Sequence, residues 1–138
     1  MKNNKGFSLV ELIIVIAIMA ILVGVMAPQL IKYIEKTNVS SDTQLCDSVR
    51  TALTTACMDP DVVKEGGSLS DTTGATINAT NITGSVKSVA EEILGVSLAD
   101  AKSQLKSKSA KGGDLIYVKQ GNQIKVYCAG NPSIYSGN

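Results

Sequence analysis

The sequence predicts an α+β protein. One long N-terminal helix, with a membrane half and an amphipathic half, packs against a small domain with short helices and a C-terminal antiparallel β-hairpin. Three observations lead to this fold class. An unbroken apolar run, residues 12–27, lies near the N-terminus, a helical pattern continues from it to about Met58, and two β-rich runs flank the pair Gly121-Asn122.

The N-terminal segment is a short basic leader followed by an apolar helix. Two lysines precede residues 7–31, in which Ser8, Glu11 and Gln29 are the only polar residues. A helix rises ~1.5 Å per residue and needs roughly 20 residues to cross the hydrocarbon core, so this segment can span a membrane. The basic leader places its N-terminus in the cytoplasm. No small-x-small cleavage site follows the apolar run, which disfavours an ordinary secretory signal peptide.

Glu11 is the one charged residue within the apolar segment. A charge at the bilayer centre costs ~2.5–3.5 kcal/mol on insertion scales, and less near an interface. Two interpretations follow. Either Glu11 lies shallow enough for its carboxylate to reach the interface, or it pairs with a cation inside an apolar assembly, where an unpaired carboxylate would be costly.

Residues 6–13, Gly-Phe-Ser-Leu-Val-Glu-Leu-Ile, together with the apolar run, resemble the processing site of type IV prepilins and the related pseudopilins. The resemblance covers about thirty residues, including Pro28, and implies a pilin-like fold. It implies cleavage between Gly6 and Phe7, N-methylation of the new Phe7 amine, and pairing of Glu11 with the Phe7 amine of a neighbouring subunit. Cleavage would create the cation that Glu11 lacks in the uncut chain.

The same resemblance implies three parts: a leader peptide, residues 1–6; a transmembrane and filament-core helix, residues 7–31; and an exported pilin domain, residues 32–138, which includes the amphipathic half of the long helix. The implied partners are other copies of the chain, minor pilins, a prepilin peptidase and methyltransferase, an inner-membrane assembly platform, and the membrane before assembly. The precursor would be single-pass in the cytoplasmic membrane, and the assembled protein would lie in an extracellular filament.

A proline interrupts the membrane helix. Pro28 removes one backbone hydrogen bond, and its ring clashes with the carbonyl of Gly24. A kink is one interpretation, since membrane helices tolerate such breaks. The resemblance suggests a further one, in which the segment from Gly24 to Pro28 loses helicity when subunits pack and the filament stretches.

The helical pattern beyond the membrane segment runs from Gln29 to about Met58, where Asp59-Pro60-Asp61 ends it. Its predicted core-facing stripe is polar in the middle third and comprises Leu30, Ile34, Thr37/Asn38, Ser41, Leu45, Val49, Ala52/Leu53 and Ala56. The remaining predictions are a surface loop over 66–84, a helix over 85–94, a second helix from a Ser97 cap to about Lys106, a hairpin of 115–120 with 123–128, and a surface tail from Ala129.

The three cysteines leave one without an intramolecular partner if a disulfide forms. Cys46 and Cys57 lie on one helix, roughly 16 Å apart by helical rise, whereas disulfide Cα atoms lie ~4.4–6.8 Å apart. A bridge would therefore join Cys128 to Cys57 or to Cys46. Cys57 is slightly preferred because a C-terminal hairpin reaches the outer end of the helix easily. The alternative is three buried thiols that act as small hydrophobic residues.

Composition argues against an enzyme. The chain has no histidine and a net charge of +1, and without Lys2 and Lys5 it has eleven basic against twelve acidic residues. Catalytic triads that need histidine are therefore excluded. Neither the net charge of the full chain nor that of the chain without the two lysines indicates nucleic-acid binding. A patch of Lys102, Lys106, Lys108 and Lys111 leaves nucleic acid as an open partner, although a solvated helix face is favoured. We expect no catalytic residue, cofactor or metal.

The leading functional hypothesis is a structural subunit of a type IV pilus. The first alternative is a pseudopilin of a type II secretion or competence DNA-uptake system, and the second is a signal-anchored single-pass protein whose domain binds a ligand. A methylated Phe7 at the mature N-terminus would support the first two hypotheses. Neighbouring secretion or competence genes would favour the pseudopilin.

Overall fold

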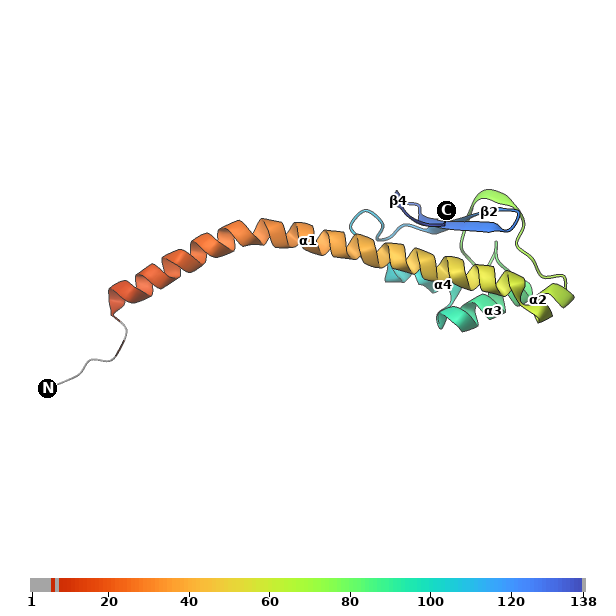
Figure 1. Ribbon diagram of the computed structural model, residues 1–138, viewed down its shortest axis with the longest axis horizontal. Helices are drawn as coiled ribbons and strands as arrows, with labels where there is room; N and C mark the ends of the chain where they lie inside the picture. Colours follow the sequence, from red (N-terminus) through yellow and green to blue (C-terminus); the bar gives the residue numbers. More distant parts are fainter. Residues whose placement is uncertain (1–5, 7, 138) are drawn as a thin grey trace. The chain divides into compact units, whose positions relative to one another are not determined.

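The computed structural model describes Gly6 and residues 8–137 (Figure 1). Backbone contacts divide the chain into two units, Met1–Glu35 and Lys36–Asn138, which are described separately below. The elements in chain order are α1 (Leu9–Met58), α2 (Pro60–Lys64), β1 (Thr72–Thr76), α3 (Gly84–Leu94), α4 (Leu98–Ala101), the 3₁₀ helix η1 (Lys102–Gln104), β2 (Leu115–Gln120), β3 (Gln123–Cys128) and β4 (Asn131–Ser136).

The predicted long helix is confirmed. Helix α1 has 50 residues and ends at Met58. The residue after it, Asp59, is extended (φ −62°, ψ 128°), because a residue before proline is disfavoured in the helical region. Asp59 then caps a second, short helix by accepting hydrogen bonds from the N–H groups of Asp61 and Val62, with Pro60 at the first helical position. The sequence signal that ends α1 thus also begins α2.

The second unit of the chain contains one antiparallel sheet with strand order β1-β2-β3-β4. The predicted hairpin is confirmed, since β2 pairs with β3 in continuous register from Leu115↔Cys128 to Gln120↔Gln123. Its turn uses Gly121 at φ +61°, a conformation that glycine adopts without strain. Ile124, Val126 and Cys128 are buried on one face of β3, as the period-two pattern predicts.

The prediction of a loop over 66–84 and of a surface tail from Ala129 is wrong in part, because each segment contributes an edge strand. β1 pairs with β2, with an irregular register between Thr72 and Ala75, and β4 pairs with β3. Both segments are rich in small and polar residues, so their local pattern resembles a loop. In β4, Pro132 is tolerated because the strand lies at an edge, and Ile134 is buried in the core.

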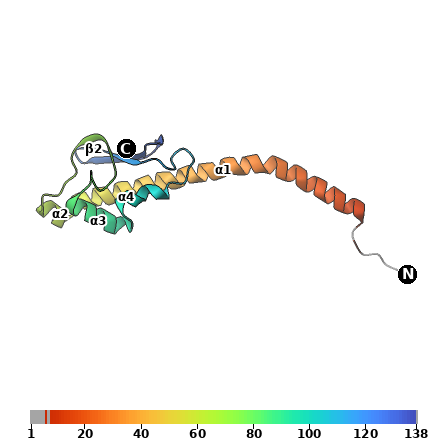
Figure 2. The same ribbon diagram turned by 180° about the vertical axis from the view of Figure 1, so that it is seen from behind.

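The sheet lies on one side of the C-terminal half of α1, and α3 and α4 lie on the other side (Figures 1 and 2). The stripe of α1 that faces this core comprises Asp42, Cys46, Val49, Ala52, Leu53 and Ala56. The predicted stripe is therefore correct from Val49 onward, whereas Leu30 and Ile34 at its start are exposed and its middle part is shifted by one position. Ser41 and Leu45 are only partly buried, and Asp42 and Cys46 take the inner positions.

The two predicted short helices are present, and the second is shorter than expected. α3 ends at Leu94, and Gly95 after it adopts the left-handed conformation typical of a helix C-cap (φ 75°). Ser97 caps α4 by accepting a hydrogen bond from Asp100 N–H. The α-helical turn ends at Ala101 and continues as η1 to Gln104, so the helix expected to reach about Lys106 is divided in two.

Candidate processing and assembly site

The start of α1 is closed by a reciprocal pair of hydrogen bonds. The backbone N–H of Ser8 donates to Glu11 Oε2 at 3.0 Å, and the backbone N–H of Glu11 donates to Ser8 Oγ at 3.3 Å. This arrangement is a capping box, in which the residue before the helix and the third helical residue satisfy each other's N–H groups. The Ser-x-x-Glu spacing of Ser8 and Glu11 is its sequence signature, although the capping box was not among the predicted features.

The proposed cleavage junction precedes this cap. Gly6 is exposed, and a Cβ built on it would meet no heavy atom within 4 Å. Phe7, the residue expected to be methylated, lies outside the described residues, as do the two leader lysines.

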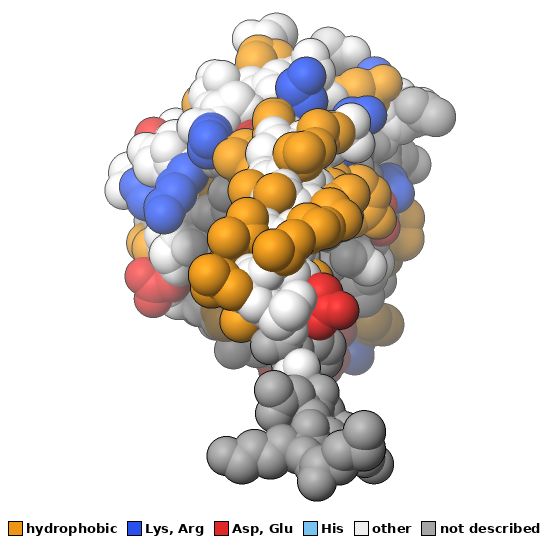
Figure 3. Space-filling view, turned by 90° about the vertical axis from the view of Figure 1, so that its left-hand side faces the viewer, with side chains coloured by type: hydrophobic (Ala, Val, Ile, Leu, Met, Phe, Trp, Pro, Cys, Tyr) orange, Lys and Arg blue, Asp and Glu red, His pale blue; other side chains and the backbone are white. Residues whose placement is uncertain are grey.

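The first half of α1 has an apolar surface. Its side chains are exposed, with fractions from 46% at Val15 to 74% at Leu9, and Figure 3 shows hydrophobic side chains gathered along the helix. A stretch of 18 residues within α1 has a mean hydropathy of 3.0, so the helix is long and apolar enough to cross a membrane. Soluble monomers rarely expose contiguous apolar patches of more than a few hundred Å². This surface therefore fits lipid or other copies of the helix.

Gly24 and Pro28 both lie within continuous helix. α1 contains Pro28 without a break, and a Cβ on Gly24 would meet no heavy atom within 4 Å. The expected loss of helicity concerns packed subunits, so it stays a prediction.

The cysteines occupy two different places in the second unit of the chain. Cys46 Sγ and Cys128 Sγ are 3.6 Å apart, in contact but not bonded, and both residues are fully buried. Hydrogen bonding between the two thiols, either of which can donate, raises the pKa of Cys46 and lowers the pKa of Cys128. Cys57 is half-buried, and desolvation raises the pKa of its thiol. The preferred pairing of Cys57 with Cys128 is thus not the pair that the structure brings together.

Asp42 is a fully buried carboxylate on α1. Its Oδ1 accepts a hydrogen bond from Lys106 N–H at 2.8 Å, and its Oδ2 accepts one from Ser107 N–H at 2.9 Å. These bonds join α1 to the segment that follows η1. Burial of a carboxylate is costly unless its oxygens are hydrogen-bonded, and here both oxygens are. No motif singled out Asp42; only its position next to the helical stripe could have indicated burial.

A second polar contact joins α1 to the last strand. Ser136 Oγ donates to Asp47 Oδ1 at 2.7 Å, and Arg50 Nε donates to Ser136 Oγ at 3.1 Å. The hydrogen bond from Ser136, followed by the one from Arg50, lowers the pKa of Asp47. The contact holds β4, an edge strand of polar composition, against the helix.

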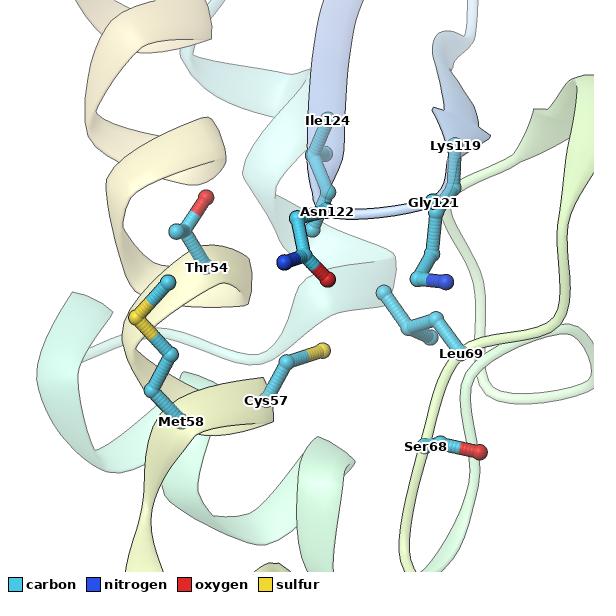
Figure 4. A pocket seen from close by; sticks show the side chains of 9 residues that line it. All are labelled: Thr54, Cys57, Met58, Ser68, Leu69, Lys119, Gly121, Asn122 and Ile124. Carbon is cyan, nitrogen blue, oxygen red and sulfur yellow. The ribbon is translucent and has the colours of Figure 1, made fainter.

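One pocket of about 180 Å³ lies at the outer end of α1 (Figure 4). Cys57 and Met58 of α1 line it opposite the hairpin turn, Gly121 and Asn122, and Lys119 contributes from β2. Its volume is below the ~300–1,000 Å³ typical of small-molecule sites. Within the described residues, no group of three or more Cys, Asp or Glu side chains is placed to hold a metal ion.

The basic patch is partly neutralised. Lys102 Nζ lies 2.9 Å from Asp114 Oδ1, in a pair that is about half exposed. The patch therefore carries less free charge than its four lysines suggest, which does not favour a nucleic-acid partner.

Comparison with known proteins identifies the N-terminal site. Residues 1–27 match the family described as the prokaryotic N-terminal methylation motif. The apolar helix, its capped glutamate and the α+β remainder thus describe a pilin-like fold whose N-terminal segment carries the methylation motif.

The chain is homologous to type IV fimbrial proteins. It is 42% identical over 55 residues to a fimbrial protein of Moraxella nonliquefaciens, covering 40% of this chain and 36% of that protein. It is 41% identical over 56 residues to the type IV major fimbrial protein FimA of Dichelobacter nodosus, covering 41% and 36% respectively. The chain thus spans a little over a third of the length of these curated relatives. No solved structure matches it significantly.

Proposed function

We propose that this chain is a structural subunit of a type IV pilus. A prepilin peptidase cleaves it between Gly6 and Phe7, the new amine is methylated, and the subunit assembles into a helical filament through the N-terminal half of α1. The observation that carries the proposal is the methylation motif, because it coincides with the N-terminal half of α1, where the large apolar side chains are exposed and the first turn contains Glu11. The homology to fimbrial proteins favours a structural role over catalysis.

Glu11 is the proposed assembly residue, and its capping hydrogen bond leaves the carboxylate able to bind a cation from another subunit. The carboxylate accepts Ser8 N–H through Oε2. A carboxylate has two oxygens and about four acceptor sites, so it can keep this bond and also accept the amine of another subunit. In an apolar bundle the attraction between the two charges is far stronger than in water. Docking is then favoured at the register that brings Phe7 of one subunit to Glu11 of the next.

The cleavage step determines when this pairing becomes available. Before the cut, the free amine is at Met1, six residues before Phe7, and the nitrogen of Phe7 is an uncharged amide. After the cut, the amine carries a charge beside the first turn of α1. The leader of residues 1–6 thus prevents premature assembly, and residues 7–31 anchor the precursor in the cytoplasmic membrane until the helix enters the filament.

The exported domain of residues 32–138 would then lie on the outside of the filament. Its polar surface suits contact with water, while the apolar helix supplies the filament core. The proposed partners are further copies of this chain, minor pilins, the processing peptidase with its methyltransferase, and an inner-membrane assembly platform.

Mass spectrometry of the mature N-terminus tests this proposal. The expected N-terminal residue is N-methylated Phe7, in a chain recovered from filaments sheared from the cell surface. A functional form that begins at an intact Met1 would refute processing and would favour an anchored single-pass protein. A methylated chain that stays in the envelope and is needed for secretion or DNA uptake would identify a pseudopilin.

A further inference from the structure

Two cysteines from distant parts of the sequence meet in the core of the exported part. Cys46 lies on the buried stripe of α1, and Cys128 is the last residue of β3. Both are fully buried, and their sulfur atoms are 3.6 Å apart. Among the described residues, this is the one sulfur–sulfur contact. It joins positions 82 residues apart in the chain.

The environment of Cys57 is different. Its thiol faces the pocket at the end of α1, between Met58 and the hairpin turn (Figure 4). It is half-buried, and the side chains that share the pocket with it are those of Leu69, Lys119 and other residues without a second thiol. Helical rise places it roughly 16 Å from Cys46.

We propose that Cys46 and Cys128 form an intramolecular disulfide in the exported protein and that Cys57 keeps a free thiol. The proposal rests on the proposed function only for export, which moves these residues to the side of the membrane where disulfides persist. The bond ties the sheet to α1.

The reaction balances as a thiol–disulfide exchange. The thiolate of one cysteine attacks a sulfur of an external disulfide, either that of an exported thiol oxidoreductase or that of oxidised glutathione, and releases one thiol of the oxidant. The second cysteine then displaces the remaining oxidant thiol from the mixed disulfide. Two protons and two electrons leave the cysteine pair, one S–S bond forms between Cys46 and Cys128, and the oxidant disulfide is reduced to two thiols.

Only a small movement is needed to close the bond. The sulfurs must approach from 3.6 Å to about 2.05 Å, a change on the scale of a side-chain rotation. Because both residues are fully buried, the exchange takes place while α1 and the sheet are still docking during folding. Once the core has closed, external reductants cannot reach the bond without unfolding.

The digestion pattern of the chain makes the pairing easy to read. Trypsin cleaves after Lys36, Arg50, Lys64 and Lys125, which places the three cysteines on three separate peptides, 37–50, 51–64 and 126–138. The full-length chain is extracted in detergent and denatured in the presence of N-ethylmaleimide to block all free thiols, and a second sample is first unfolded and refolded in detergent with reduced and oxidised glutathione. Both samples are then digested without reduction.

The expected product in both samples is peptide 37–50 linked to peptide 126–138, with the mass of two hydrogens lost, and peptide 51–64 alkylated. A link that includes peptide 51–64 would overturn the proposal, and so would three alkylated thiols in the glutathione sample. The N-terminal peptide from the same digest reports methylation of Phe7 independently. Failure of the disulfide is therefore distinguishable from failure of the proposed function.

Thermal unfolding supplies a second readout. A native disulfide that closes a long loop typically contributes enough stability to raise the Tm of a domain of this size by roughly 10–20 °C. We expect this difference between oxidised and reduced wild type, and an equal difference in the matched control Cys57→Ala. Cys46→Ala should show no difference on reduction. An unchanged Tm on reduction of the wild type would overturn the stabilising role.

Discussion

Removal of the Asp42 carboxylate tests the contact that joins α1 to the segment after η1. In Asp42→Ala, the N–H groups of Lys106 and Ser107 lose their acceptor, and the Ser107 N–H is buried. A hydrogen bond to a charged group contributes ~1.5–3 kcal/mol, and a buried donor left unsatisfied costs ~1–3 kcal/mol. Two such bonds predict a loss of about 3–5 kcal/mol, a large part of the ~5–15 kcal/mol that stabilises a typical domain.

The assay is thermal unfolding of the full chain in detergent, followed by near-ultraviolet circular dichroism. The signal of Tyr117, which is buried in the core, reports the folding of the second unit, whereas total helicity is dominated by α1. We expect the Tm of Asp42→Ala to fall by at least about 12 °C. The matched control is Asp61→Ala, an exposed aspartate whose pair with Lys64 at 3.7 Å contributes less than ~1 kcal/mol. Equal Tm values for the two variants would refute the stabilising role of the two hydrogen bonds to Asp42.

Three further perturbations follow. Glu11→Ala should leave membrane insertion intact but block or strongly impair filaments, because the proposed partner of the Phe7 amine is lost; normal filaments in negative-stain microscopy would show that Glu11 only caps its own helix. In the folded chain the pKa of Asp47 is lowered from its ordinary value of 3.8. The ionised carboxylate therefore stabilises the fold above pH 3.8, and this stabilisation is lost as the pH falls through the folded pKa. Denaturant unfolding at pH 7 and in acid should therefore show Asp47→Asn less stable than wild type at pH 7, with the difference shrinking in acid. In Gly130→Ala the new Cβ would overlap the backbone oxygen of Ser109, which predicts a loss of ~1–3 kcal/mol by denaturant unfolding; Gly24→Ala, with open space around it, should show no such loss.

The elements predicted correctly are those with a strong local signal. The apolar run and the three-four spacing predict α1, and proline after Asp59 ends it. The Gly-Asn turn between two β-rich runs predicts the hairpin, because few other conformations suit that pair of residues. Residues 6–13 lie within the matched methylation motif, a linear pattern that needs no fold to be recognised; cleavage there stays a prediction.

The elements that were missed depend on partners elsewhere in the chain. β1 and β4 have few apolar residues, and each becomes a strand because a stronger strand offers it a free edge. The burial of Asp42 is comparable. An aspartate on a helix is normally exposed, and only the two N–H groups of the packed segment make its inner position favourable.

The cysteines separate what the sequence determines from what the tertiary structure decides. The sequence alone determines that Cys46 and Cys57 cannot pair on an intact helix and that Cys128 ends a strand. It does not determine which way the hairpin lies along α1. The structure places the turn, with Asn122, beside Cys57. A strand advances ~3.4 Å per residue, so Cys128 lies roughly 20 Å back along the helix, beside Cys46. Local residue types determine each element, but the direction in which two elements pack depends on contacts between residues far apart in the chain.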